Sequence, residues 1–267
     1  MRDTLFSRPI PPFDGYIFDL DGTVYLGETL LPGAGEAIVG LRALGRRVVF
    51  LSNNPTHTRE QYAARLTRLG LPTPMQEIVN SAQVMVQWLL HEAPGCRVFV
   101  VGEQPLKDEL SAAGFLPVER AEEVDVVIAS FDRTFAYWKL QTAFDAIRRG
   151  ARFVATNADR YCPVPGGGQP DAAAVIAAIE ACTATKVEVV VGKPSSIMAR
   201  AVAEIIQLPA ERCLMTGDRL ETDIAMGLAA GMATALTLTG ATTRALLEAS
   251  EIRPDYVIER LDDLIHS

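Results

Sequence analysis

The sequence has few of the residues that build histidine-based or cysteine-based sites. It holds three histidines and four cysteines in 267 residues, and no two cysteines form a CxxC pair. A zinc knuckle, a dithiol redox motif and a histidine-centred relay are therefore not indicated. Widely spaced cysteines are typical of a protein whose thiols stay reduced, as they do in the cytosol.

The chain also lacks long apolar runs and an excess of positive charge. No stretch approaches the ~20 apolar residues of a membrane-spanning helix. The N-terminal segment MRDTLFSRPIPPFDG has no continuous apolar core of the kind found in signal peptides. A net charge of −8 and a pI near 5.0 argue against a nucleic-acid-binding surface. We therefore expect a cytoplasmic protein that binds neither membranes nor nucleic acids.

Hydrophobic residues make up 49 % of the sequence, and they fall into short runs that alternate with helical patterns. This order predicts an α/β fold, with a doubly wound parallel sheet and right-handed crossovers. The proline-rich and glycine-rich stretch CPVPGGGQP, residues 162–170, is expected to be an irregular loop. Strands are expected at 16–18, 47–52, 97–101, 124–129, 152–155, 187–191, 213–216, 234–237 and 256–258. Helices are expected at 35–44, 58–69, 81–92, 105–113, 137–149, 171–181, 195–206, 221–230 and 242–249.

Polar side chains follow four of the expected strands. In open α/β sheets, functional groups gather at the carboxyl ends of strands, so one shared site is predicted. About 140 residues with their own strand–helix series separate the second and third of these segments, far more than an ordinary connection needs. We therefore predict an inserted α/β domain at 81–185, with a core formed by 1–80 and 186–267. The four segments are FDLDGT (18–23), FLSNN (50–54), VVGKPS (191–196) and MTGDRLETD (215–223).

Two carboxylates, Asp19 and Asp21, stand two positions apart, which on an extended chain places them on the same side. One interpretation is a solvated strand end followed by an ordinary Asp-Gly turn. The other is that a divalent cation, most simply Mg²⁺, offsets their repulsion, and that one carboxylate attacks phosphorus. Asp218, directly after a strand and a glycine, is interpreted as a metal ligand, and Asp223 as a supporting group of the outer shell.

The segment Ser52, Asn53 and Asn54 offers hydroxyl, amide and backbone donors that can bind phosphate oxygens. The alternative is a turn before the next helix, and this alternative is strongest for Asn54, which precedes a proline. Lys193 is either an ordinary surface lysine or an ammonium that screens Asp19 and a substrate phosphate.

In this order, DxDGT, SNN, GKPS and GDRLETD resemble the four motifs of the haloacid dehalogenase (HAD) superfamily of phosphatases. The insertion between the second and third motifs, together with ATNADRYCP and PDAAAVIAAIEA, resembles the NagD-like, p-nitrophenyl phosphatase-like branch, subfamily IIA. That branch implies a Rossmann-like, HAD-like core with an inserted cap of type C2, and it suggests a homodimer.

The resemblance also implies a role for each residue. Asp19 would be the nucleophile, and Asp21 would protonate the leaving alcohol and then activate water. Mg²⁺ would be held by the Asp19 carboxylate, the Asp21 main-chain carbonyl and Asp218, with Asp223 in the outer shell. The phosphoryl group would be bound by Ser52 and Lys193, with help from Asn53 and Asn54.

The implied activity is a Mg²⁺-dependent phosphomonoesterase that acts on a small metabolite. Sugar phosphates, phosphoglycolate, glycerol phosphate and nucleotides all fit this expectation. Phosphoryl transfer to a second substrate, a phospho-accepting signalling module and a non-catalytic phosphometabolite-binding protein remain as alternatives. Cap residues Cys162 and Asp159 are expected near the leaving group. Many relatives have PGxG where this chain has PDAA at 170–173, and Asp171 is interpreted as a helix N-cap.

Overall fold

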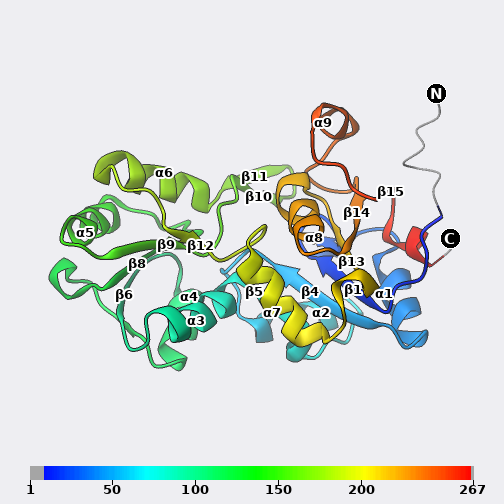
Figure 1. Cartoon of the computed structure of the whole chain (residues 1–267), viewed down its shortest axis with the longest axis horizontal. Helices are drawn as coiled ribbons and strands as arrows, with labels where there is room; N and C mark the ends of the chain where they lie inside the picture. Colours follow the sequence, from blue (N-terminus) through cyan, green and yellow to red (C-terminus); the bar gives the residue numbers. More distant parts are fainter. Residues whose placement is uncertain (1–8, 266–267) are drawn as a thin grey trace.

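The structure, a computed structural model, describes residues 9–265. Two sheets, each flanked by helices, lie side by side along the long axis of the molecule (Figure 1). Residues 1–8 and 266–267 lie outside the described range. The prediction that the N-terminal segment, residues 1–15, is not a signal peptide therefore falls partly outside it.

The larger sheet has β1 near its middle and runs in the order β15-β14-β13-β1-β4-β5, with all neighbours parallel. From β1 the chain moves outward to β4 and β5, and it later re-enters on the other side of β1. The topological switch point, where α/β sheets place their ligands, therefore lies at β1. The strands are β1 (Gly15–Asp19), β4 (Arg47–Ser52), β5 (Ile78–Asn80), β13 (Cys213–Gly217), β14 (Ala233–Thr237) and β15 (Tyr256–Ile258).

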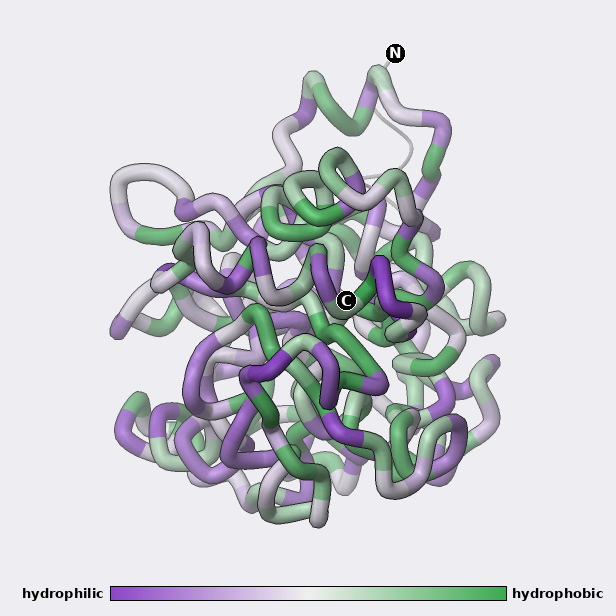
Figure 2. The backbone as a smooth tube through the Cα atoms, turned by 90° about the vertical axis from the view of Figure 1, so that its left-hand side faces the viewer, coloured by the Kyte–Doolittle hydropathy of each residue, from purple (hydrophilic) through white to green (hydrophobic). Residues whose placement is uncertain are grey.

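Helices cover both faces of this sheet, as its uniformly hydrophobic strands require. Ile17 and Phe18 are neighbours in β1, and both are 0 % exposed because they enter hydrophobic clusters on opposite faces. Figure 2 shows hydrophobic and hydrophilic stretches alternating along the coiled segments, as amphipathic helices require. The helices are α1 (Ala34–Ala43) and α2 (Arg59–Arg68) on one face, α3 (Ser81–Glu92) and α7 (Ser196–Ile206) on the other, and the short α8 (Ala225–Ala229) and α9 (Arg244–Ala249).

The smaller sheet is also parallel, in the order β12-β9-β8-β6-β7. Helices α5 and α6 pack on one of its faces, while α3 and α4 pack on the other. Its elements are β6 (Arg97–Val101), α4 (Gln104–Ala112), β7 (Leu116–Pro117), β8 (Val126–Ala129), α5 (Tyr137–Arg148), β9 (Arg152–Ala155), α6 (Ala172–Thr183) and β12 (Val189–Val190).

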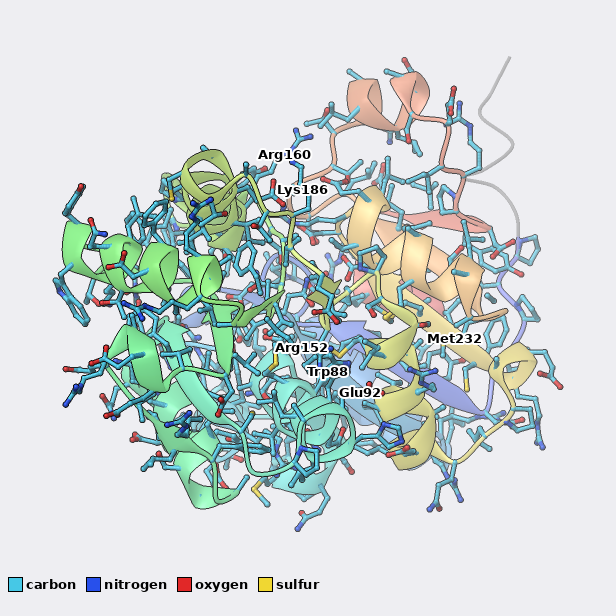
Figure 3. The ribbon with its side chains drawn as sticks, turned by 60° about the vertical axis from the view of Figure 1, so that its left-hand side comes forward. Trp88, Glu92, Arg152, Arg160, Lys186 and Met232 are labelled. Atoms are coloured by element: carbon cyan, nitrogen blue, oxygen red, sulfur yellow. The ribbon has the colours of Figure 1, made fainter. Side chains whose placement is uncertain are left out.

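Helix α3 joins the two sheets. Side chains of both sheets, such as Ile17 of β1 and Val154 of β9, belong to one continuous hydrophobic cluster that runs through α3 and α7. At the outer end of α3, the Arg152 guanidinium lies 4.9 Å from the centre of the Trp88 ring, and it also donates to the main-chain oxygen of Glu92 (Figure 3). The two sheets therefore share an apolar contact on the α3–α7 side of the molecule.

The strand expected at 187–191 forms only at Val189–Val190, and it pairs with β9 in the smaller sheet. The chain thus returns to the larger sheet after residue 190, later than the expected boundary between 185 and 186. Local sequence predicts a strand but not its partner, which explains the displacement. We propose that the core and the inserted domain divide near residues 80 and 191.

The stretch expected to be irregular, 162–170, is a hairpin, and this prediction was wrong. Strands β10 (Tyr161–Val164) and β11 (Gly167–Pro170) pair antiparallel to each other. A two-stranded ribbon has only edge strands, so the missing N–H of Pro163 costs no ladder bond. Gly166 turns the chain with a φ of 83°.

Four further short strands, β2, β3, β5 and β7, were not predicted from the sequence, because two or three residues give no recognisable alternation. Strands β2 (Tyr25–Leu26) and β3 (Thr29–Leu30) form a small hairpin just after β1. The helix expected at 221–230 begins with a π-helical turn, Leu220–Ile224, before α8. Such turns widen a helix locally and are frequent at functional sites.

The central position of β1 makes its buried side chains critical for stability. We expect Ile17→Ala to lower the free energy of unfolding by about 2–5 kcal/mol, because it leaves a cavity between β1 and α7. Denaturant titration with fluorescence or circular dichroism detection measures this change. Val39→Ala on α1, where the side chain is 55 % exposed, is the control and should shift stability by less than about 0.5 kcal/mol. Equal effects of the two substitutions would contradict the assignment of β1 to the core.

Candidate active site

The site lies where three neighbouring strands of the larger sheet end. Asp19 is the last residue of β1, Ser52 is the last residue of β4, and Asp218 directly follows β13. Because the three strands are parallel and adjacent, their carboxyl ends meet at one edge. The remaining predicted segment, 191–196, reaches this edge differently, because Lys193 follows a strand of the smaller sheet at the point where the chain crosses back.

Lys193 is buried between two carboxylates. Its ammonium lies 2.6 Å from Asp19 Oδ1 and 2.7 Å from Asp223 Oδ1, and the residue is 3 % exposed. Burial alone would lower the pKa of Lys193, but the two carboxylates outweigh burial and raise it. The ammonium is therefore charged throughout the physiological pH range, and the interpretation of Lys193 as an ordinary surface lysine does not hold.

Three buried carboxylates gather around this lysine. Oxygen atoms of Asp19, Asp218 and Asp223 all lie within 4.8 Å of one another. Burial, and then the charges of Asp19 and Asp223, raise the pKa of Asp218 well above its usual value. Burial also raises the pKa of Asp223 to about 6, although Lys193 acts in the opposite direction. One lysine is thus not enough to offset the crowded negative charge.

The oxygens of these carboxylates differ in their partners. Asp223 has both oxygens engaged, one by Lys193 and the other by the backbone N–H of Arg219 at 3.1 Å. Asp218 accepts from the backbone N–H of Ala241 at 2.5 Å through Oδ2. Among the described residues, none donates a hydrogen bond to Asp218 Oδ1. Asp218 is therefore better placed than Asp223 to bind a cation directly.

The turn after β1 explains why glycine and threonine follow Asp21. Gly22 adopts a φ of +95°, and a Cβ at this position would lie 2.6 Å from Asp218 Oδ2. Both the backbone conformation and the close approach therefore favour glycine. Thr23 is 0 % exposed, and its hydroxyl donates to Asp19 Oδ2 at 3.2 Å. The turn thus orients the first carboxylate while it leads the chain away.

Asp21 is half-buried and lines the pocket, but it is not part of the three-carboxylate cluster. Burial, and then the charge of Asp19, raise the pKa of Asp21 to about 7. Arg65 and Lys193 oppose this shift and do not cancel it. At neutral pH the carboxyl group can therefore both hold and release a proton, unlike an ordinary aspartate.

Ser52, Asn53 and Asn54 form the β4 side of the pocket. Both the oxygen and the nitrogen of the Asn53 side-chain amide bind the backbone of Lys193. Its Oδ1 accepts from the Lys193 N–H at 2.7 Å, and its Nδ2 donates to the Lys193 carbonyl at 3.2 Å. Asn53 therefore holds the lysine loop against β4. The Ser52 hydroxyl accepts from the Asn54 N–H at 3.1 Å and lies 3.2 Å from the Tyr62 hydroxyl.

The β10–β11 hairpin closes the pocket from the side of the smaller sheet. Arg219, next to Asp218, donates to the Tyr161 carbonyl at 2.8 Å, and its guanidinium lies 4.6 Å from the centre of the Tyr161 ring. The Asn54 amide donates to the Cys162 sulfur at 3.6 Å. Burial, and then the charge of Asp21, raise the pKa of Cys162 to about 12, so this thiol is not a nucleophile at neutral pH.

All ten site residues predicted from the sequence line this one pocket, which encloses about 40 Å³. The structure thus brings together the core residues and both cap residues, Cys162 and Asp159. The pocket is lined by Asp19, Asp21, Ser52, Asn53, Asn54, Asp159, Tyr161, Cys162, Pro163, Asp171, Lys193, Asp218, Arg219, Thr222 and Asp223.

Comparison with known proteins assigns this site to a family. Models of the haloacid dehalogenase-like hydrolases match residues 16–116 and, under the description HAD-hydrolase-like, residues 190–264. The sugar-phosphatase AraL of Bacillus subtilis is 41 % identical over 97 % of this chain and 94 % of its own length. The chloroplastic phosphoglycolate phosphatase 1A of Arabidopsis thaliana is 32 % identical over 96 % of this chain and 77 % of its own length.

The chain belongs to the haloacid dehalogenase-like hydrolases. Within this family it is a NagD-like phosphatase, as two solved structures show. The 4-nitrophenylphosphatase of Thermotoga maritima aligns with a TM-score of 0.90 at 36 % identity, covering 96 % of this chain and 97 % of that one. NagD of Escherichia coli K-12 aligns with a TM-score of 0.85 at 30 % identity, covering 94 % and 98 %.

Sequence reasoning missed several residues of this hydrolase's pocket. Arg219 and Thr222 stand inside the GDRLETD segment, and the charge of Arg219 beside Asp218 was a signal that could have pointed to the arginine. Tyr161 immediately precedes Cys162 and gave no separate signal. Asp171 was interpreted only as an N-cap. It does cap α6, accepting from the Ala172 N–H at 2.5 Å, but it also lines the pocket.

Asp171 gives this phosphatase a measurable pH dependence. Burial, and then the charge of Asp159, raise the pKa of Asp171 to about 7 from 3.8. Between these two values the folded state holds a proton that the unfolded state has lost, so this aspartate lowers stability as the pH rises. The wild type should therefore lose stability relative to Asp171→Asn, which keeps the capping oxygen and cannot ionise.

In metal-free buffer, we expect the difference in unfolding free energy to move in favour of Asp171→Asn by about 2–3 kcal/mol between pH 5 and pH 8. Urea titrations of both proteins at each pH measure this difference. A difference that stays constant across this range would show that the folded-state pKa of Asp171 is ordinary.

Proposed function

We propose that this NagD-like phosphatase is a Mg²⁺-dependent phosphomonoesterase that acts on a small phosphorylated metabolite through an aspartyl-phosphate at Asp19. The observation that carries the proposal is the buried cluster of Asp19, Asp218 and Asp223 with Lys193 at its side. A dianionic phosphate can approach a carboxylate only where positive charge is concentrated, and this cluster concentrates the groups that bind such charge.

The donor set fits a magnesium ion. Asp19 and Asp218 offer hard carboxylate oxygens, and Asp218 has an oxygen without a donor among the described residues. The backbone packs closely around Asp218, since a Cβ at Gly240 would lie 1.9 Å from Asp218 Oδ2. Asp19, Asp218 and the Asp21 main-chain carbonyl would hold the ion, and Asp223 would support it from outside. Bound there, Mg²⁺ would offset the negative charge of the phosphate and the carboxylates.

The phosphate itself would be held by groups around Asp19. Lys193 is charged and buried beside Asp19, so its ammonium can also contact a phosphoryl oxygen. Ser52 ends β4 at the same edge of the sheet, and its hydroxyl can donate to another phosphoryl oxygen. Asn53 would act mainly by holding the backbone of Lys193 in place.

The reaction proceeds in two steps. In the first, a carboxylate oxygen of Asp19 bonds to phosphorus as the bond from phosphorus to the leaving oxygen breaks, and that oxygen takes a proton from Asp21. In the second, a water oxygen bonds to phosphorus as the bond to Asp19 breaks, and Asp21 takes the proton of this water. Inorganic phosphate leaves, and both aspartates return to their starting states.

Separate environments support these two roles. Asp19 receives a hydrogen bond from the Thr23 hydroxyl and an ion pair from Lys193, both of which hold its carboxyl oxygens in place for attack. Asp21 lies outside this cluster and can keep a proton near neutral pH. The two aspartates thus divide nucleophilic attack and proton transfer between them.

Small metabolites are the substrates that the relatives support, since their names include a sugar phosphatase and a phosphoglycolate phosphatase. Within residues 9–265, no helix is long and apolar enough to cross a membrane. The cytoplasmic location, the homodimer and the absence of nucleic-acid binding stay predictions from the sequence.

Phosphate release from 4-nitrophenyl phosphate should require Mg²⁺. We expect release to stop when EDTA removes divalent ions and to return when Mg²⁺ is added in excess. Asp19→Asn should lower the turnover number by at least about 10³-fold, because the amide is not a nucleophile. Asp145→Asn on α5, outside the pocket, is the matched control and should turn over like the wild type.

Two other results of this assay would replace the proposal. A phosphorylated protein that accumulates without turnover would indicate a phospho-accepting signalling module. Neither turnover nor phosphorylation, with phosphate still bound, would indicate a non-catalytic binding protein.

Asp21→Asn tests the proton transfer. We expect the turnover number to fall by about 10²–10⁴-fold, because the amide can neither protonate the leaving oxygen nor accept a proton from water. The loss should be greater for an alkyl phosphate, such as glycerol phosphate, than for 4-nitrophenyl phosphate, whose leaving oxygen needs little protonation. Steady-state kinetics on both substrates measure this, and an unchanged turnover number would remove Asp21 from the mechanism.

A further inference from the structure

The wall of the pocket that belongs to the smaller sheet carries two carboxyl groups, Asp171 and Asp159. Asp171 is 4 % exposed, and its Oδ1 accepts from the Asn157 amide at 3.0 Å and from the Ala172 N–H at 2.5 Å. Within the described part of the chain, Asp171 Oδ2 accepts no hydrogen bond. The capping of α6 therefore uses one oxygen of this buried carboxyl group and leaves the other available in the pocket.

Asn157 holds the two carboxyl groups together. This residue is 0 % exposed, and its Nδ2 donates both to Asp171 Oδ1 at 3.0 Å and to Asp159 Oδ2 at 2.9 Å. Asp159 Oδ2 also accepts from the Asn53 amide at 2.8 Å, which ties this wall to the end of β4. Asp159 Oδ1 has no hydrogen-bond donor among residues 9–265. The pair is thus built into the pocket and presents one oxygen from each side chain.

Both cations among the described lining residues already have partners, two carboxylates for Lys193 and Tyr161 for Arg219. Lys193 pairs with Asp19 and Asp223. Arg219 bonds the Tyr161 carbonyl and stacks on its ring, and Asp218 and Asp159 both raise the pKa of this arginine, though burial opposes them. Of the described lining residues, six are aspartates and two are cations. A leaving group with its own negative charge would therefore enter a wall that repels it.

We propose that Asp171 and Asp159 select substrates whose leaving group is an uncharged polyol or sugar, by accepting hydrogen bonds from its hydroxyl groups and repelling carboxylates. This inference rests on the proposed phosphatase function and names its substrate class. Hydroxyl groups donate well to carboxylates, and hydrogen bonds to charged acceptors are the stronger ones. Of the small metabolites considered above, sugar and glycerol phosphates fit this wall, whereas phosphoglycolate does not.

Asp171 does more than cap helix α6. Serine, threonine and asparagine begin helices as well as aspartate does, so capping alone does not call for a buried carboxyl group at this position. A residue that only capped α6 would not need Asn157, which is buried and donates its side-chain amide to both carboxyl groups. The pair lines the same pocket as Cys162, Arg219 and the reacting Asp21.

The test compares kcat/KM of the Mg²⁺-loaded enzyme on three substrates at a pH of about 8.5, above the raised Asp171 pKa of about 7, so that Asp171 is charged. These are ribose 5-phosphate, with an uncharged hydroxylated leaving group; 2-phosphoglycolate, with a carboxylate; and 4-nitrophenyl phosphate, with neither. We expect the wild type to prefer ribose 5-phosphate to 2-phosphoglycolate by at least about tenfold, the effect of one charged hydrogen bond.

Asp171→Asn should lower kcat/KM for ribose 5-phosphate by about tenfold and raise it several-fold for 2-phosphoglycolate. Its kcat/KM for 4-nitrophenyl phosphate should stay within about twofold of the wild type. Because asparagine still caps α6 and accepts from Asn157, this variant keeps the fold. Asp159→Asn should shift the preference in the same direction, and Asp145→Asn, which changes the same charge outside the pocket, should shift nothing.

Two results would overturn the inference. One is a wild type that prefers 2-phosphoglycolate, and the other is an Asp171→Asn variant that changes all three substrates by the same factor, as a purely structural role requires. Failure of the proposed function is distinguishable, because the wild type would then release no phosphate from 4-nitrophenyl phosphate either.

Discussion

The buried ammonium of Lys193 is the interaction on which the rest of the site depends. Its charge lies away from water and is tolerable only because Asp19 and Asp223 flank it. Asn53 holds the backbone of this lysine from the end of β4, so three segments distant in sequence are fixed by one residue. The carboxylates are in turn crowded more closely than one cation can neutralise, and the proposed divalent ion would offset this excess of negative charge.

The sequence predicted the element order well, because buried parallel strands leave continuous hydrophobic runs. Strand 47–52 and helix 81–92 have the expected bounds. Pairing was harder, because a local run does not say which strand lies beside it, and so β12 was placed with the wrong sheet. The β10–β11 hairpin was missed since prolines and glycines are read as breakers, although an edge ribbon accepts them.

The same contrast applies to the site. Residues at strand ends, such as Asp19 and Asp218, could be found from sequence because the ends of adjacent parallel strands must meet. Asp171 could not, since its N-cap position already explained it, and its second partner, Asn157, is brought beside it only by the fold. In the proposed mechanism, the larger sheet would supply the groups for the reaction, and the smaller sheet would supply the wall that meets the leaving group.

The uneven contact between the two sheets determines how a substrate can enter. The pocket is lined by residues of both sheets, such as Asp19 and Asp159. On the side of the β10–β11 hairpin, the hairpin is held to the larger sheet by polar contacts such as that of Arg219 with Tyr161. Water can replace such contacts at little cost. On the opposite side, α3 and α7 share an apolar cluster that water cannot replace. A rotation about the α3–α7 contact that lifts the hairpin would therefore keep the apolar contacts, and we expect it to be the least costly way to widen the pocket.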